Sequence, residues 1–103
     1  MAEQLFVYGT LQRPDVQQQV IGRIISGTPA TLPGYTLLHH VYPMALPQAG
    51  AQIEGVLLDL TLQELMHTDY YEGSAYVRVS ESLTCGRTAW LYCGSPALER
   101  VLR

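Results

Sequence analysis

The segment Tyr8-Gly9-Thr10-Leu11 has the residue types of an anion-binding turn. It follows the apolar residues Leu5 to Val7, a β-forming run too short for a helix. Gly9 lets the chain turn with its backbone N–H groups uncovered, and consecutive uncovered N–H groups form a concave nest for a carboxylate or a developing oxyanion. A plain strand-to-loop turn can have the same sequence, so both interpretations stay open here.

Metal and disulfide chemistry have no comparable pattern. His39 and His40 are adjacent, so on a strand they point to opposite faces, and His67 stands alone in a predicted helix. Cys85 and Cys93 lie eight positions apart, which matches no zinc spacing. We therefore expect no metal and no cofactor, and we interpret both cysteines as reduced small hydrophobic side chains in or near strands.

Length and composition favour one globular domain, residues 1–103, with one modest core. Apolar residues make up 48% of the chain and charged residues 15%, and 9 Gly with 6 Pro indicate many turns. The net charge of -3 and the scattered arginines argue against nucleic acid, because a basic patch is missing. We expect a small-molecule ligand.

The N-terminus Met1-Ala2-Glu3-Gln4 lacks the basic and apolar regions of a signal peptide. No apolar run approaches the roughly 20 residues needed to span a bilayer. These features predict a cytoplasmic protein without membrane contact.

The first half of the chain predicts one helix and two strands around several breaks. A helix is expected from Asp15, with Gln18 in the capping position, and its inward face contains Val16, Val20, Ile21 and Ile24. Breaks are expected at Gly27, Pro29, Pro33 and Gly34. A strand should run from Tyr35 to Val41 and end at a rigid Tyr42-Pro43 corner. After a loop over Pro47 to Gly50, a second strand is expected over Gln52 to Leu60.

The second half predicts a short helix followed by a β-hairpin. Thr61 to Glu64 is a capping-box sequence, opening a helix that ends at Gly73 and has Leu62, Leu65 and Met66 on one side. Strands over Tyr76 to Ser82 and Arg87 to Cys93 should form a hairpin around Leu83 to Gly86. A terminal helix from Ser95-Pro96 to Arg103 completes the chain. These elements predict an α+β fold, a mixed, strongly curved sheet or small β-barrel with flanking helices.

Two segments, Tyr8-Gly9-Thr10-Leu11 and Asp69-Tyr70-Tyr71-Glu72-Gly73 with the following Tyr76-Val77-Arg78, carry a resemblance. Together with Gly34-Tyr35, Tyr42-Pro43 and Glu54-Gly55-Val56, they resemble the gamma-glutamylcyclotransferase-like family over about residues 4–93. The chain departs from the family pattern at Thr68, where leucine is common, and at the short Ser74-Ala75 segment.

The resemblance implies an enzyme that cyclises a γ-glutamyl amine to 5-oxoproline and releases the free amine. It implies that Tyr8, Gly9, Thr10 and Leu11 hold the glutamyl group and that Glu72 is the catalytic acid-base residue. We also assign Tyr42, Pro43, Tyr76 and Arg78 to the substrate-binding set. No cofactor is implied, and the protein is expected as a monomer or homodimer.

Several alternatives stay open. In the alternative interpretation, Arg78 is a surface residue or the partner of Asp69. Thr10 then only fixes its own loop by a local hydrogen bond. Tyr8 and Tyr76 then close the core, with their hydroxyls at its rim. The whole chain is otherwise a non-catalytic binding module for γ-glutamyl-type small molecules, or a dimeric interaction domain.

Overall fold

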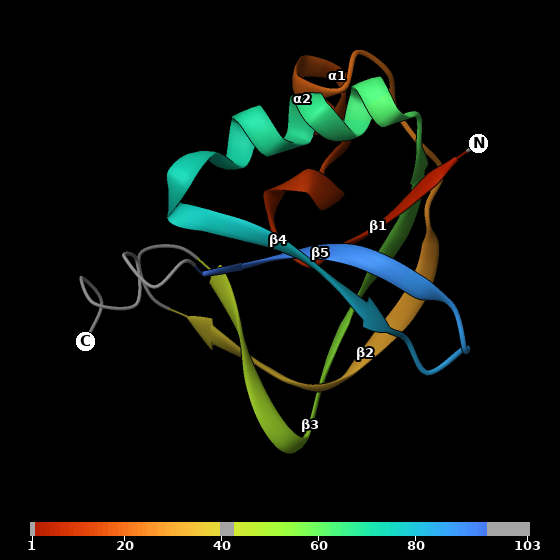
Figure 1. Ribbon diagram of the computed structural model, residues 1–103. Coiled ribbons are helices and arrows are strands. Elements are labelled where there is room, and N and C mark those ends of the chain that lie inside the picture. The colour runs from red at the N-terminus through yellow and green to blue at the C-terminus, as the bar shows by residue number, and fades with distance from the viewer. Residues whose placement is uncertain (1, 40–42, 95–103) are drawn as a thin grey trace.

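The computed structural model describes residues 2–39 and 43–94, which form a five-stranded mixed sheet and two α-helices (Figure 1). In chain order the elements are β1 (Glu3–Val7), the 3₁₀ helix η1 (Thr10–Gln12), α1 (Pro14–Val20), β2 (Thr28–His39), β3 (Pro43–Leu60), α2 (Leu62–Glu72), the 3₁₀ helix η2 (Gly73–Ala75), β4 (Tyr76–Ser82) and β5 (Thr88–Gly94).

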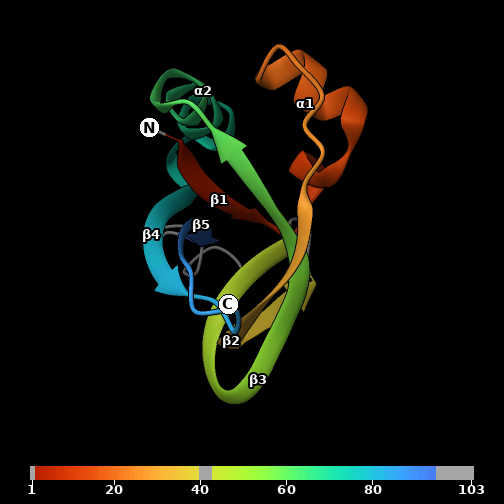
Figure 2. The ribbon, with the colours of Figure 1, turned by 90° about the vertical axis from the view of Figure 1, so that its right-hand side faces the viewer.

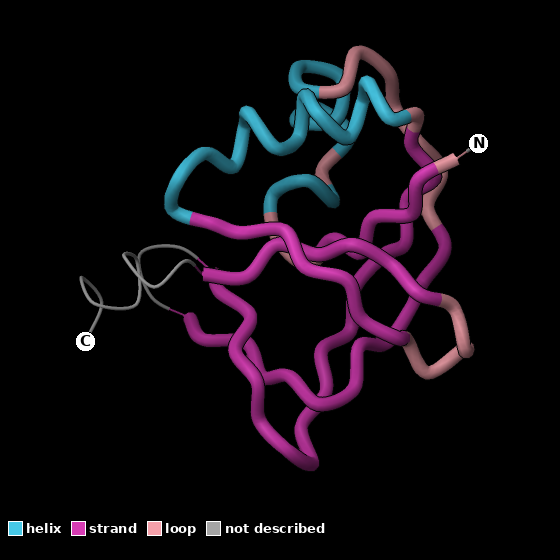
Figure 3. Tube along the Cα trace, in the orientation of Figure 1, coloured by secondary structure: helices cyan, strands magenta, loops and turns pink. Residues whose placement is uncertain are grey.

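The sheet curls along the long strand β3, which pairs with three other strands, β2, β1 and β5. Its order is β2-β3-β1-β5-β4. The C-terminal part of β3 pairs antiparallel with β1, from Val7 opposite Val56 to Glu3 opposite Leu60, while Ala45 near its start pairs in parallel with Cys93 of β5. Figure 3 shows the resulting strongly bent trace. The predicted α+β class with a mixed, curved sheet is confirmed.

Both helices lie at one end of the curled sheet, above β1 and the upper part of β3 (Figures 1 and 2). Side chains alternate between the two faces of β1, as the strand period requires. Leu5 and Val7 join a cluster with Leu65 of α2, while Phe6 joins the cluster on the opposite face with Leu91. The apolar core is therefore divided by the sheet into two parts.

Gly55 brings β3 against the end of β1. A Cβ atom at this position would lie 2.5 Å from the carbonyl oxygen of Val7 and 2.7 Å from Cζ of Phe6, so any larger residue would push the strands apart. This contact fixes the point at which β1 ends and the Tyr8–Leu11 loop begins.

The expected breaks at Pro29 and Pro33 are wrong. Both prolines lie inside β2, opposite Val56 and Gln52 of β3. β2 stands at the edge of the sheet, where a missing N–H removes no ladder bond on the open side. The register shifts only between Pro33 and Tyr35.

The expected loop over Pro47 to Gly50 is also replaced by strand, since β3 continues from Pro43 to Leu60. Pro47 pairs with Tyr35 and Gln52 with Pro33, so the four residues between Pro47 and Gln52 have no partner in β2. The strand bulges there instead of ending.

α2 starts and ends at its predicted positions, whereas α1 ends at Val20, a turn earlier than predicted, and both helices bury fewer apolar residues than expected. α1 begins at Pro14, and Ile24 lies beyond its end with 60% of its surface exposed. In α2 the capping box and the Gly73 stop are confirmed, and Leu65 is fully buried. Leu62 and Met66 share a side of the helix with Leu65 by their spacing, but both are exposed, so of the three only Leu65 packs into the core.

The strand over Gln52 to Leu60 and the β4–β5 hairpin are confirmed. The predicted terminal helix lies outside the described residues. Among the residues that are described, no helix is long and apolar enough to cross a membrane.

Candidate active site

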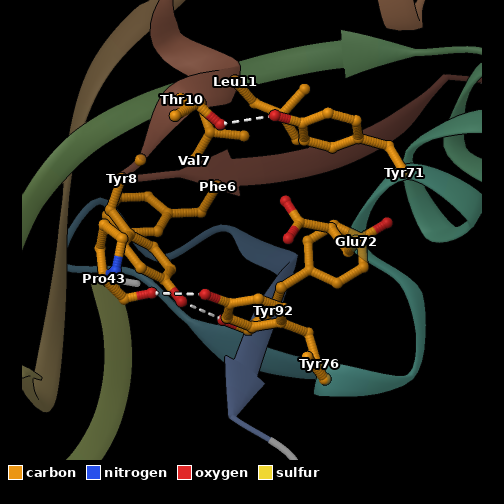
Figure 4. Close-up of a pocket in the computed structure, with 12 residues that line it drawn as sticks. Phe6, Val7, Tyr8, Thr10, Leu11, Pro43, Tyr71, Glu72, Tyr76 and Tyr92 are labelled. Atoms are coloured by element: carbon orange, nitrogen blue, oxygen red, sulfur yellow. Dashed lines mark hydrogen bonds between the residues drawn. The ribbon is translucent and has the colours of Figure 1, made fainter. Parts of the chain in front are cut away.

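A cavity of about 460 Å³ opens between the end of β1, the end of α2 and the start of β3 (Figure 4). Its wall is mostly apolar and aromatic. The lining residues are Phe6, Val7, Tyr8, Gly9, Thr10, Leu11, Pro43, Tyr71, Glu72, Ala75, Tyr76 and Tyr92.

Glu72 supplies the one charged side chain among these lining residues. It is the last residue of α2, and Gly73, with a φ of 68°, ends the helix there by donating its N–H to the carbonyl of Asp69. Figure 4 shows the Glu72 carboxylate pointing into the cavity. No hydrogen bond or ion pair joins this carboxylate to another described residue.

Burial raises the pKa of Glu72 from its ordinary value to about 7, because the charged form loses solvation. The C-terminal end of a helix carries partial negative charge, which acts in the same direction. A carboxyl group with this pKa exchanges a proton readily near neutral pH.

The Tyr8–Leu11 loop faces Glu72 across the cavity. The chain turns into η1 at Gly9, where the N–H of Gln12 donates to the carbonyl of Gly9. The N–H groups of Gly9, Thr10 and Leu11 donate to no acceptor in the described part of the chain. The loop thus retains the uncovered amides that its sequence predicts.

A buried glutamine fastens this loop from behind. Gln17 of α1 is 3% exposed, its Nε2 donates to the carbonyl of Leu11 at 2.9 Å, and its Oε1 accepts from the N–H of Ile25 at 2.9 Å. Both ends of the amide are satisfied inside the core, which fixes the orientation of the side chain. Gln17 therefore ties the loop to α1 and to the chain that leads into β2.

Tyrosine hydroxyls close the far side of the cavity. Tyr8 donates its O–H to the carbonyl of Tyr92 and accepts the N–H of Ala45 at 3.2 Å. Tyr76 donates to the carbonyl of Pro43 at 2.9 Å. Burial raises the pKa of Tyr8 well above its usual range, so this hydroxyl stays protonated and acts as a structural donor.

A second polar cluster holds the last turn of α2 against the sheet. Asp69 accepts from Nε of Arg78 at 2.8 Å and from the hydroxyl of Tyr92 at 2.7 Å. The Tyr92 hydroxyl also shares a hydrogen bond of 2.7 Å with buried Thr68. The Arg78 guanidinium lies 4.3 Å from the ring centroid of Trp90. Thr68, which replaces the common leucine, is thus part of this cluster.

The structure brings together most of the sequence-predicted site residues. Glu72, Tyr8 to Leu11, Pro43 and Tyr76 line the same cavity. Tyr42 lies outside the described residues. Arg78 is not among the lining residues; it pairs with Asp69 and lies over the Trp90 ring, which favours the alternative of an Asp69 partner over substrate binding.

Tyr71, Tyr92 and Gln17 take part in the site and were not predicted. Gln17 carried a signal, because it is a polar residue one turn before Ile21 on the inward face of α1. Tyr71 precedes Glu72, and the sequence singled it out only as a member of the Asp69–Gly73 motif. Tyr92 lies on the strand that was predicted to pair with β4, but the sequence did not show that this residue lines the cavity.

The described residues contain no group of three or more His, Cys, Asp or Glu side chains that could hold a metal ion. Cys85 is free and exposed, contrary to its interpretation as a hydrophobic side chain. Cys93 is free and partly buried, and burial raises the pKa of its thiol to about 11.

Known proteins are similar to this chain in sequence and in fold. The family described as gamma-glutamyl cyclotransferase, AIG2-like, matches residues 5–101. AIG2-like protein B of Arabidopsis thaliana is 39% identical over 79 residues, which are 73% of this chain and 46% of that protein. The chain spans about half the length of the curated relatives it matches.

Solved structures agree with the sequence match. A solution structure of an Arabidopsis thaliana protein superposes with a TM-score of 0.81 at 24% identity, covering 91% of this chain and 62% of the other. A structure described as gamma-glutamyl cyclotransferase superposes with a TM-score of 0.73 at 15% identity, covering 92% and 68%. Since the family match extends over nearly the whole sequence, this chain belongs to the gamma-glutamyl cyclotransferase, AIG2-like family.

Proposed function

We propose that the chain is a γ-glutamylcyclotransferase, a single-domain, cofactor-independent enzyme that converts a γ-glutamyl amine to 5-oxoproline and a free amine. The observation that carries this proposal is the unpaired Glu72 carboxylate in the cavity, with a pKa near 7. Family membership supplies the γ-glutamyl substrate class.

The reaction needs one proton carrier and one correctly folded substrate. The α-amino nitrogen of the γ-glutamyl group attacks its own γ-carbonyl carbon, a five-membered ring forms, and the bond to the departing nitrogen breaks. Because both reacting groups belong to one molecule, holding it in a near-attack shape supplies up to about 7 to 11 kcal/mol of the barrier. No water is consumed and no covalent enzyme intermediate is needed.

Glu72 is the proposed acid-base residue. The α-ammonium group cannot attack until it loses a proton, and the leaving nitrogen must gain one. In this proposal Glu72 takes the first proton and returns it to the leaving nitrogen. The substrate carboxylate or the oxyanion of the intermediate accepts hydrogen bonds from the N–H groups of Gly9, Thr10 and Leu11.

The direct test is to incubate the purified protein with a panel of γ-glutamyl amino acids, γ-glutamyl-lysine and glutathione and to measure 5-oxoproline. Release from at least one member supports the proposal. Heat protection by these compounds without any product would instead favour a non-catalytic binding module.

A further inference from the structure

One polar contact joins the two walls of the cavity and links the two motif segments Tyr8–Leu11 and Asp69–Gly73. Oγ1 of Thr10, in the loop, and the hydroxyl of Tyr71, in the last turn of α2, share a hydrogen bond of 2.9 Å. Figure 4 shows this bond along one edge of the cavity, beside the Glu72 carboxylate. Among the described residues, no other hydrogen bond is recorded between α2 and the segment Gly9–Leu11.

Each residue of this hydrogen bond lies in, or next to, a group with a proposed role in the reaction. Thr10 belongs to the loop whose amides face the substrate, and Tyr71 immediately precedes Glu72 on α2. Gln17 holds the rear of the loop, and Asp69 holds the helix against β4 and β5. Neither of these contacts spans the cavity itself; core packing also joins the two walls, since Leu11 of the loop and Leu65 of α2 belong to one buried cluster.

Packing alone does not hold the Tyr71 ring in place. Tyr71 is 44% exposed, and it also lines a second cavity of about 620 Å³ together with Gln19, Val20, His67 and Tyr70. The Tyr71 residue is therefore not enclosed by neighbouring side chains. The bond to Thr10 favours the position in which the ring closes the edge of the first cavity.

We propose that the Thr10–Tyr71 hydrogen bond is a latch that sets the spacing between the substrate-holding loop and Glu72, so that Thr10 and Tyr71 are a positioning pair for the cyclisation. This inference rests on the proposed function. Loss of this hydrogen bond leaves the loop amides and the Glu72 carboxylate in place chemically but allows the distance between them to vary, which disfavours the near-attack geometry. The loss should therefore appear in kcat more than in KM.

The test uses Tyr71→Phe and Thr10→Val, which remove the hydroxyl from either side, and the double variant. Each is assayed for 5-oxoproline with the panel compound that the parent converts fastest, at a temperature at which all variants are folded. We expect kcat to fall by about 2- to 12-fold in each single variant, the range of one hydrogen bond, with KM nearly unchanged. The double variant should be no slower than the slower single variant, because both remove the same bond.

Tyr70→Phe is the matched control. Tyr70 is the neighbouring tyrosine; it is 91% exposed and does not line the first cavity, which contains Glu72. Loss of its hydroxyl should therefore leave kcat at the parental value. Thr10→Ser retains a hydroxyl and should lie closer to the parent than Thr10→Val does. This recovery would not follow if Thr10 served only to pack the loop.

The outcomes separate this inference from the proposed function. An active parent whose Tyr71→Phe variant keeps parental kcat contradicts the latch and leaves the proposed function standing. Additive losses in the double variant also contradict it, because the two hydroxyls would then act independently. A parent that releases no 5-oxoproline from any panel compound contradicts the proposed function, and the positioning role falls with it.

Discussion

The two ends of α2 carry glutamates in opposite electrostatic states. At the N-terminal end, Glu64 accepts the N–H of Thr61 at 2.8 Å and Nε of Arg23 at 2.6 Å, and these partners lower its pKa to about 2. At the C-terminal end, Glu72 has no such partner, and burial raises its pKa to about 7. One carboxylate is ionised at neutral pH as part of a helix cap, whereas the other is free to exchange a proton.

This difference shows that residue type and secondary structure do not decide the role of a glutamate. Both residues lie in one eleven-residue helix, so the contrast comes from what surrounds each carboxylate. Hydrogen-bond donors at the first turn stabilise the charge of Glu64, whereas an apolar wall with no cationic lining residue penalises the charge of Glu72.

The largest expected effect comes from Glu72→Gln, which keeps size and polarity but cannot take a proton. Turnover should fall by roughly 10² to 10⁴, the usual span of general acid-base catalysis. Glu64→Gln is the matched control, and its kcat should equal that of the parent. A γ-glutamyl ligand should raise the melting temperature of Glu72→Gln about as much as that of the parent. Near-parental 5-oxoproline release by Glu72→Gln would assign the proton transfer to another group, with Asp69 and Glu54 the first candidates.

A second prediction concerns the pH dependence of turnover. If Glu72 must be ionised to act as a base, kcat/KM should rise with pH through a midpoint near its pKa of about 7. The measurement is kcat/KM across the pH range in the parent and in Glu64→Gln, which should share this acid limb. A limb near pH 4.5 in both proteins would mean that the base has an ordinary carboxyl pKa.

The same two glutamates should influence stability in opposite directions as the pH changes. Glu72 has a higher pKa folded than unfolded, so the unfolded chain loses this proton first and the contribution of Glu72 to the unfolding free energy falls between about pH 4.5 and 7. Glu64 has a lower pKa folded, so its contribution is present above about pH 4.5 and is lost as the pH falls toward 2. Denaturant unfolding of the parent, Glu72→Gln and Glu64→Gln across this pH range measures both contributions to the free energy of unfolding. If the unfolding free energies of Glu72→Gln and the parent change in parallel with pH, the expectation for Glu72 is contradicted.

A smaller loss is expected from Glu64→Ala, which removes the reciprocal half of the capping box and the partner of Arg23. The free energy of unfolding near neutral pH should fall by about 1 to 2 kcal/mol, the usual cost of losing a helix cap. Equilibrium urea unfolding gives this value. An unchanged urea midpoint would show that water replaces the Glu64 contacts at no cost.

The sequence predicted elements well where the deciding residues are close in the chain. Thr61 and Glu64 lie three apart, so the capping box was visible without tertiary information. The Tyr76 to Ser82 strand and the Gly73 helix stop are local in the same sense.

The errors concern properties set by distant neighbours. Pro29 and Pro33 fit in β2 because that strand lies at the sheet edge, which depends on its pairing with β3. Arg78 turns to Asp69 and Trp90, a choice that strand alternation cannot reveal. Glu72 itself resembles a solvated residue at a helix end, and only its resemblance to a family motif separated it from Glu64.

Carboxyl-detected NMR titration of the ligand-free protein tests the central contrast most directly, because Glu64 and Glu72 report in one sample. The account predicts a midpoint near pH 7 for the Glu72 carboxyl carbon and a midpoint near pH 2 for Glu64, with the Glu72 resonance assigned by its loss in Glu72→Gln. A Glu72 midpoint near 4.5, the ordinary value for a glutamate side chain, would contradict the claim that this cavity prepares Glu72 for proton transfer.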